Sequence, residues 1–233
     1  MLLQNEDSLF RSEVTMKLIY ANGACSLSVH ILLEELDIPH EALRVSLEDK
    51  TVLDSYNPRS YVPVLVRDDG TVMTEAISIL QYLSTVKGGA FMPEATLDKT
   101  KCIEWLVFIS SELHKGLGPL FHPDGVKPEF EKEVRAKYDD RLQIIEDELS
   151  EGHFLMGHEY TIADMYCLAI LRIAEHVKVK FDAFPLIQKY KKNLELRNTI
   201  RRVIEKEERA ELETRPRSYS QRMTEFRNHE RNH

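Results

Sequence analysis

Residues 16–36 read MKLIYANGACSLSVHILLEEL, and the order of residue types in this stretch predicts a strand, a turn and a helix. Met16 to Ala21 is a short apolar run that favours a β-strand and ends at Asn22-Gly23, a pair typical of turns. Apolar residues then recur at helical spacing from Leu27 to Leu36. Cys25 therefore falls at the expected start of the helix.

The residues that follow predict three more strands and one more helix. A second strand is expected at 42–47, and a charged loop comes after it. Two further apolar runs, 62–66 and 71–73, are separated by Asp69-Gly70, a pair that favours a hairpin. Thr74 is expected to cap the next helix. Periodicity alone thus gives the order β-α-β-loop-β-β-α for this half of the chain.

The second half is predicted to be all-α. One long helix is expected around Leu106–Leu117, and another starts near Pro128. Thr161 and Asp164 match a capping box, which predicts the start of a central helix. The predicted division comprises an N-terminal extension at 1–15, a first domain at 16–87, a linker at 88–98, a helical domain at 99–208 and a polar C-terminal extension at 209–233.

Composition and charge exclude several classes of protein. The chain has 233 residues, and its 39 acidic and 31 basic side chains give a net charge of -8. Nucleic acid is therefore an unexpected partner, because phosphates are bound by an excess of Lys and Arg. No apolar run approaches the roughly 20 residues of a membrane-spanning helix. Three cysteines without a CxxC pair favour a cytoplasmic protein with no zinc ribbon.

Cys25 is the best candidate for a nucleophile. At a helix N-terminus, unpaired amides and the helix dipole favour the thiolate form of a cysteine. The alternative is that Cys25 is an inert buried residue, as most free cysteines are. Ser26 either caps the helix or donates a hydrogen bond to whatever Cys25 contacts. Cys102 and Cys167 lie within helical stripes and are interpreted as packing residues.

Two nearby features suit an extended, anionic ligand. Val62-Pro63 opens a strand, and its backbone edge can pair with a peptide, although a plain strand-opening proline explains it as well. Thr74-Glu75-Ala76 begins a helix whose free amides can hold a carboxylate, although most helix starts bind nothing. His114 and Lys115, near the end of a long helix, are explained by the helix dipole alone.

The last five residues, His229 to His233, read HERNH and match the zinc-binding pattern HExxH. We reject this match, because it lies in a polar tail with no third ligand and no apolar helix to hold the two imidazoles in place. The sequence therefore predicts no metal site.

Four segments carry a family pattern. In chain order they are MKLIYANGACSLSVH from residue 16, NPRSYVPVLVRDDGTVMTEAISILQYL from residue 57, IEWLVFISSELHKGLGPLFHPD from residue 103 and YTIADMYCLAILR from residue 160. Together they resemble the bacterial beta-class glutathione transferases. The resemblance implies a thioredoxin-like first domain with the order β-α-β-α-β-β-α, an all-α helical-bundle second domain and a homodimer.

The resemblance also implies an activity and the residues that perform it. Such an enzyme conjugates the thiolate of glutathione, its co-substrate, to small electrophilic or hydrophobic compounds and needs no other cofactor. Cys25 would contact glutathione, with Ser26 beside it and Tyr20 on the preceding strand. His114 would reach the site from the second domain. These four residues are the expected catalytic group.

The remaining assignments concern the binding of glutathione. The resemblance implies that Val62 and a cis Pro63 hold its cysteinyl part through the backbone, and that Glu75 with the amide of Ala76 holds its γ-glutamyl part. Two further contacts are implied, from Lys50 to the glycine carboxylate and from Lys115 of the second domain.

Two positions depart from the family pattern. Val107 stands where many members have an asparagine that reaches the glutathione of the neighbouring subunit, and Ala76 replaces a residue that is usually Ser or Gly. These departures keep a non-catalytic binding or interaction protein open as an alternative. Within the enzyme hypothesis, Cys25 itself could exchange with glutathionylated substrates. A dithiol oxidoreductase is disfavoured, because GACS supplies one thiol where CxxC supplies two.

Overall fold

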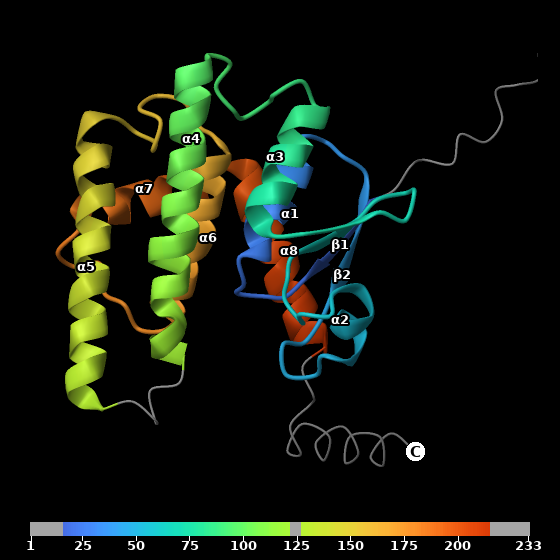
Figure 1. The fold of residues 1–233 in the computed structure, drawn as a ribbon, viewed down its shortest axis with the longest axis horizontal. Helices are drawn as coiled ribbons and strands as arrows, with labels where there is room; N and C mark the ends of the chain where they lie inside the picture. Colours follow the sequence, from blue (N-terminus) through green and yellow to red (C-terminus); the bar gives the residue numbers. More distant parts are fainter. Residues whose placement is uncertain (1–15, 122–126, 215–233) are drawn as a thin grey trace, which may run out of the picture.

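The computed structural model describes residues 16–121 and 127–214 of the chain. A four-stranded sheet with its helices forms one half of the molecule, and a helical bundle forms the other (Figure 1). This confirms the two-part fold predicted from the sequence. The predicted extension at 1–15 and the HExxH match at 229–233 lie outside the described residues.

The first half follows the order β-α-β-α-β-β-α, as the thioredoxin-like resemblance predicts. Its elements are β1 (Met16–Tyr20), α1 (Ser26–Glu35), β2 (His40–Arg44), α2 (Thr51–Tyr56), β3 (Val64–Val66), β4 (Val72–Thr74) and α3 (Ala76–Val86). The strand order is β2-β1-β3-β4. β1 pairs parallel with β2, and the pairs β1–β3 and β3–β4 are antiparallel.

Side chains alternate between the two faces of the sheet along β1. Leu18 and Tyr20 join the large core that includes α1 and α3, whereas Ile19 packs with Leu53 of α2 in a smaller cluster. Both faces of the sheet are therefore covered. The strand ends and the loops between elements are the parts of this half that remain open to a ligand.

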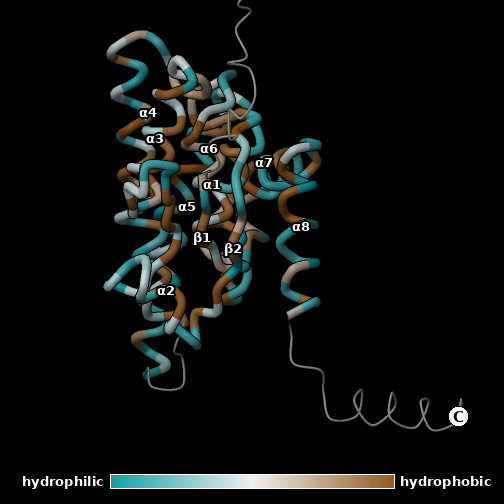
Figure 2. The backbone as a smooth tube through the Cα atoms, turned by 90° about the vertical axis from the view of Figure 1, so that its right-hand side faces the viewer, coloured by the Kyte–Doolittle hydropathy of each residue, from teal (hydrophilic) through white to brown (hydrophobic). Residues whose placement is uncertain are grey.

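The second half is helical throughout its described length. Its elements are α4 (Thr96–Phe108), the π-helix η1 (Ile109–His114), the 3₁₀-helix η2 (Lys115–Phe121), α5 (Pro128–Glu151), α6 (Ile162–His176), α7 (Pro185–Glu195) and α8 (Asn198–Thr214). α6 is the central helix, and it contacts α1, α3, α4 and α7. α8 returns to the first half and packs on α1. Hydrophobic and hydrophilic residues alternate along α8, as expected of a helix with one buried face (Figure 2).

The predicted capping box at the start of α6 is confirmed. The Thr161 hydroxyl accepts a hydrogen bond from the amide of Ala163, and the Asp164 carboxylate accepts one from the amide of Thr161 at 2.8 Å. Asp164 is fully buried and also accepts from the Leu155 amide and the Tyr190 hydroxyl, at 2.9 and 2.8 Å. This carboxylate therefore joins the start of the central helix to the preceding loop and to α7.

Three predictions for the first half are wrong in detail. β2 lies at 40–44 rather than at the predicted 42–47, because residues 40–44 are the ones that pair with β1. The charged loop contains α2, which is held by the buried Leu53. Thr74 does not cap α3, because it pairs with β3 as the last residue of β4. Glu75 takes the N-cap position instead and makes no side-chain capping bond.

The helices of the second half also differ from their predicted limits. α4 begins at Thr96, inside the predicted linker, and α8 continues to Thr214, because residues 209–214 (RAELET) are mostly good helix formers. The helix expected to continue to Leu117 changes pitch at Ile109, from α to π and then to 3₁₀. The division of the chain into domains stays a prediction.

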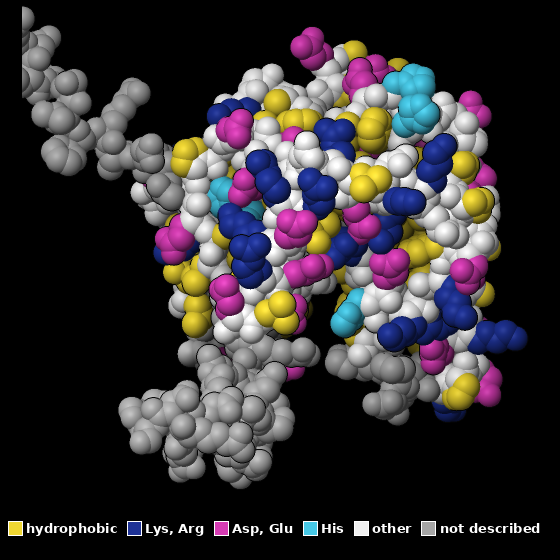
Figure 3. All heavy atoms as spheres, turned by 180° about the vertical axis from the view of Figure 1, so that it is seen from behind, with side chains coloured by type: hydrophobic (Ala, Val, Ile, Leu, Met, Phe, Trp, Pro, Cys, Tyr) yellow, Lys and Arg dark blue, Asp and Glu magenta, His cyan; other side chains and the backbone are white. Residues whose placement is uncertain are grey.

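The surface carries charges of both signs. On the face in Figure 3, Lys and Arg side chains are interspersed with Asp and Glu. Among the described helices, none has the length and apolar character required to cross a membrane.

Candidate active site

Five elements meet around Cys25. The cysteine is the N-cap of α1, Val62 lies in the loop before β3, and Glu75 is the N-cap of α3. The helical half contributes His114, the last residue of η1, and Tyr166 of α6. The site therefore lies at the junction of the two halves.

Cys25 is buried and protonated in this structure. Its Sγ donates a hydrogen bond to the Val62 carbonyl oxygen at 3.5 Å. Burial raises the pKa of the thiol to about 12; the thiol's own backbone amide opposes this effect, and the Glu75 carboxylate adds to it. The expectation that the helix start favours a thiolate is therefore wrong for the ligand-free protein, because desolvation of the charged form outweighs the helix dipole.

The Val62-Pro63 peptide bond is cis, as the resemblance implies. Pairing of β3 with both of its neighbours begins at Val64, so the backbone of Val62 takes no part in the sheet. Its carbonyl already accepts from Cys25. This places an unpaired stretch of backbone directly beside the thiol.

Glu75 adopts a backbone conformation that L-residues rarely use. Its φ is +68°, in the left-handed region, and such conformations cluster at ligand-binding sites. The side chain is exposed, and one carboxylate oxygen lies 3.7 Å from a guanidinium nitrogen of Arg59. Ala76, the first residue of α3, is buried. The start of α3 thus presents one carboxylate and one guanidinium beside its first amides.

His114 and Tyr166 form a pair across the helical half. His114 Nδ1 and the Tyr166 hydroxyl lie 3.2 Å apart, and the two rings meet edge to face. Burial lowers the pKa of His114, opposed by the Glu75 carboxylate, so the imidazole is neutral at pH 7. Burial also raises the pKa of Tyr166, and the negative charge of ionised Cys25 raises it further. Tyr166 is therefore close enough to Cys25, and His114 close enough to Glu75, for their charges to interact.

Other predicted residues lie outside this group. The Ser26 hydroxyl is buried and exchanges hydrogen bonds with the backbone of Ala21, at 3.3 Å to its amide and 3.2 Å to its carbonyl. Tyr20 packs against His30, with ring centroids 5.3 Å apart. Ser26 therefore ties α1 to β1, and Tyr20 faces the core; neither is needed to explain the chemistry at Cys25.

The two predicted lysines are exposed. Lys115 lies beside Glu112, Lys137 and Tyr138, in a hollow between the short helices and α5. Lys50 is the N-cap of the short helix α2, and its side chain reaches into solvent. In the ligand-free conformation, neither lysine has a described contact with Cys25, Val62 or Glu75.

Sequence reasoning missed Tyr166 and Arg59. Tyr166 is a hydroxyl-bearing residue inside an apolar helical run, and a buried tyrosine hydroxyl usually finds a partner. That signal indicates that the hydroxyl has a polar partner, but it does not identify the partner. Arg59 lies in the quoted segment NPRSYVP, where its charge close to Pro63 was the available signal.

The arrangement suits a ligand with a main chain, a carboxylate and a sulfur. Unpaired backbone at Val62 can exchange hydrogen bonds with a peptide, and the start of α3 with Arg59 can hold a carboxylate. The Cys25 S–H and the His114 imidazole are available beside these two sites. No other ligand chemistry is needed to explain why these groups meet.

Two family models match the chain. The model of the glutathione S-transferase N-terminal domain matches residues 23–86, and that of the glutathione S-transferase C-terminal domain matches residues 108–198. Among curated proteins, glutathione S-transferase GstA from Escherichia coli O157:H7 is 40% identical over 174 residues, which cover 72% of this chain and 86% of GstA.

Solved structures show the same similarity. BphK, a bacterial GST solved as a ternary complex, has a TM-score of 0.77 at 33% identity. The beta-class glutathione S-transferase of Sphingomonas chungbukensis has a TM-score of 0.75 at 30% identity. A sphingomonad glutathione S-transferase complexed with glutathione has a TM-score of 0.76 at 28% identity. Each match covers 82% of this chain and 98% of the other chain.

Proposed function

The chain belongs to the glutathione S-transferase family, and from this membership we propose that the corner around Cys25 binds glutathione and activates its thiol. The protein is a glutathione transferase, an enzyme that joins the sulfur of glutathione to an electrophile. We propose which residues perform this reaction, where its second substrate binds and how the protein assembles.

In this proposal each part of glutathione meets one part of the site. The backbone of Val62 pairs with the cysteinyl residue, next to the cis proline Pro63. The γ-glutamyl carboxylate lies at the start of α3, between the amide of Ala76 and the Arg59 guanidinium, while Glu75 pairs with the ammonium of the same residue. The glycine carboxylate of glutathione is assigned to the side chain of Lys50.

Activation of the thiol follows from the protonation states. Because burial raises the pKa of Cys25 to about 12, its S–H is a donor at neutral pH. It can turn from the Val62 carbonyl to stabilise a glutathione thiolate placed beside it. His114, neutral and held by Tyr166, is the second polar group that can orient the sulfur. The electrophile then binds between the two halves, next to these side chains.

The observation that carries this proposal is the contact of 3.5 Å between Cys25 Sγ and the Val62 carbonyl oxygen. It joins the thiol at the N-terminus of α1 to the stretch of backbone before β3 that takes no part in the sheet. Glutathione can meet the backbone of Val62 and the Cys25 thiol at the same time, because its cysteinyl residue carries both a peptide main chain and a sulfur.

The test compares two activities of the wild-type protein and the Cys25→Ala variant. We expect the wild type to conjugate reduced glutathione to chlorodinitrobenzene, and Cys25→Ala to lose about 10-fold or more in kcat/KM through the loss of the donor. Reduction of a glutathionylated substrate thiol should vanish entirely in Cys25→Ala if Cys25 carries the mixed disulfide. Unchanged kinetics of both reactions in Cys25→Ala would refute the assigned role.

We further propose that the protein acts as a cytoplasmic homodimer. Val107 supports the dimer, since it is 53% exposed on α4, where an apolar residue gains by meeting a second subunit. The cytoplasm is supported by the three cysteines, which are buried and free. Sedimentation velocity of the full chain tests the dimer, and a monomer at micromolar concentration would contradict it.

A further inference from the structure

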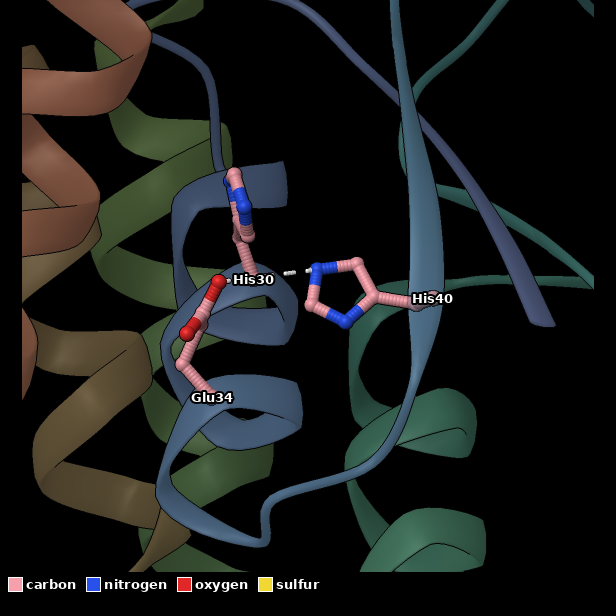
Figure 4. Close-up of side chains that lie close together, drawn as sticks. All are labelled: His30, Glu34 and His40. Carbon is pink, nitrogen blue, oxygen red and sulfur yellow. Dashed lines mark ion pairs between the residues drawn. The ribbon is translucent and has the colours of Figure 1, made fainter. Parts of the chain in front are cut away.

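A second cluster of polar side chains lies along α1, from the middle of the helix to the end opposite Cys25. His30 and Glu34 are one helical turn apart on α1, and His40 points toward them from the start of β2 (Figure 4). One nitrogen of each imidazole and one oxygen of the carboxylate lie within 4.8 Å of one another. Glu34 is about 13 Å along the helix from Cys25, so this cluster is separate from the glutathione site.

Each of the two histidines has one ring nitrogen without a hydrogen-bond partner among the described residues. His30 Nδ1 lies 2.8 Å from the Glu207 carboxylate of α8, and His40 Nδ1 donates to the Ile38 carbonyl at 2.8 Å. The Nε2 atoms of both rings are buried and have no hydrogen-bond partner among the described residues. His30 is completely buried, and the side chain of His40 is 6% exposed.

These contacts set the tautomers of the two rings. A carbonyl only accepts hydrogen bonds, and an ionised carboxylate does the same, so both Nδ1 atoms carry the proton. In the neutral form of each ring, Nε2 then holds a free lone pair. A buried lone pair without a donor is costly unless a donor or a cation meets it. Here both rings belong to a group of three side chains that also includes the Glu34 carboxylate.

We propose that His30 Nε2, His40 Nε2 and the Glu34 carboxylate bind a divalent transition-metal ion of the Zn²⁺ type. Two imidazoles and one carboxylate form a common ligand set for such ions, with a water in the fourth position. Glu207 and the Ile38 carbonyl act on the second ring nitrogens, and partners in that position orient the imidazoles that bind a metal. The ion lies apart from the glutathione site and takes no part in conjugation.

Binding requires the three ligand atoms, which lie within 4.8 Å of one another, to close in on the ion. Ligand atoms on a tetrahedral Zn²⁺ lie about 3.4 Å apart. His40 Nε2 and Glu34 Oε1 are already 3.9 Å apart. The Glu34 side chain is 29% exposed, so it can move, and it opens the site to solvent. Lys206 of α8 lies 3.1 Å from the same oxygen and competes with the ion for it.

A bound metal ion would link three elements of the fold. α1 and β2 supply the ligands, and α8 supports the site through Glu207, which holds the second nitrogen of His30. An ion that binds only the folded protein stabilises it by mass action. With Zn²⁺ about 100-fold above its dissociation constant, we expect the melting temperature to rise by about 5 to 10 °C.

The test is a titration of the full chain with Co²⁺, followed by its visible d–d absorption and by calorimetry. We expect one ion per chain, bound without the charge-transfer band of a thiolate ligand. His40→Gln should lose binding, and Glu34→Gln should weaken it about 10-fold or more. Because the chain has nine histidines, His158→Gln serves as the matched control, since His158 forms an exposed pair with His153, and His233→Gln serves as a control for the tail.

Two results would overturn the proposal. One is a wild-type protein that binds no Co²⁺ or Zn²⁺. The other is binding that survives in His40→Gln and disappears in His158→Gln or His233→Gln. Imidazole ¹⁵N spectra provide a readout that does not depend on the folding of any variant. They should show Nδ1–H tautomers for His30 and His40 in the metal-free protein, and a shift of both Nε2 signals when Zn²⁺ is added.

Discussion

At the scale of single residues, the protonation of Cys25 is the feature with the clearest consequence. Burial raises the pKa of this thiol to about 12, so at neutral pH almost none of it is thiolate in the ligand-free protein. A raised acid pKa means that the reactive form appears only as the pH increases. The thiolate content should therefore grow about tenfold per pH unit, with no plateau near neutrality.

This predicts the pH profile of Cys25 alkylation. The rate of modification by iodoacetamide, followed by mass spectrometry at Cys25, should rise steadily from about pH 6 to pH 9 without an inflection. The fully buried Cys102 and Cys167 give the background, which the Cys25→Ala variant measures. An inflection below pH 8 would show instead that the helix dipole outweighs burial.

Tyr166 gives a second prediction at this scale. Tyr166→Phe removes the hydroxyl 3.2 Å from His114 Nδ1, so the imidazole loses one of the contacts that orient it. We expect kcat/KM for conjugation to fall about 3- to 10-fold, with little change in glutathione affinity. Tyr138→Phe is the matched control, because the Tyr138 hydroxyl is buried without a partner. Equal effects of the two substitutions would contradict the role of Tyr166.

The site residues were predictable to different degrees, for physical reasons. Cys25, Val62-Pro63 and Glu75 lie at strand and helix boundaries, which local sequence marks. Ser26 was an ambiguous case, because a hydroxyl beside a turn bonds to the nearest backbone as readily as to a ligand. Tyr166 was missed, since its partner His114 is fifty-two residues away and only tertiary packing brings them together.

At the scale of elements, the start of α6 is the best-defined local structure. Asp164 accepts four hydrogen bonds, from the amides of Leu155 and Thr161 and the hydroxyls of Thr161 and Tyr190. The sequence pattern predicted the bond within the capping box. It could not predict the bonds from Leu155 and Tyr190, which come from the loop before the helix and from α7.

Substitutions of the capping box should reflect this difference. Asp164→Ala leaves buried donors unsatisfied and should lower the free energy of unfolding by about 3 to 5 kcal/mol. Thr161→Ala, which removes the capping hydroxyl together with the γ-methyl group, should cost about 1 kcal/mol. Denaturant unfolding measures both, with the exposed Asp98→Ala in the first turn of α4 as the control. A loss below about 1 kcal/mol in Asp164→Ala would contradict this account.

Other elements departed from the sequence prediction where tertiary contacts override local preference. α2 is short and polar, and one buried residue, Leu53, holds it on the sheet. Threonine is a favoured residue for helix capping, but pairing with β3 keeps Thr74 in a strand. Glu75 therefore takes the N-cap position of α3. Hydrophobic periodicity is evaluated one segment at a time, so it could predict neither outcome.

At the scale of the whole molecule, the two halves are joined through a common core and through α8. α1 contacts both α6 and α8, and Glu207 of α8 reaches the buried His30. The sequence predicted both halves but not this link, because hydrophobic periodicity indicates that a face is buried without naming the surface that covers it. The closure of α8 onto α1 follows from packing over the full chain.

The proposed dimer leads to a prediction about Val107. An asparagine at this exposed position of α4 would restore the hydrogen bond to glutathione in the partner subunit that the resemblance implies. We expect Val107→Asn to tighten glutathione binding about 3- to 10-fold, which is the worth of one hydrogen bond. Val86→Asn, an exposed valine at the end of α3, should leave the affinity unchanged. No gain in Val107→Asn would argue against a shared site.

The central claim is that glutathione binds where Cys25, Val62 and the start of α3 meet, and calorimetric titration with reduced glutathione tests it most directly. We predict a dissociation constant between the micromolar and low millimolar range for the wild type, weakened about 10-fold or more in Glu75→Gln. Glu41→Gln, an exposed carboxylate paired with Lys17 on the far edge of the sheet, should bind as the wild type does. No detectable heat in the wild type at several temperatures, or equal affinity in all three proteins, would contradict the claim.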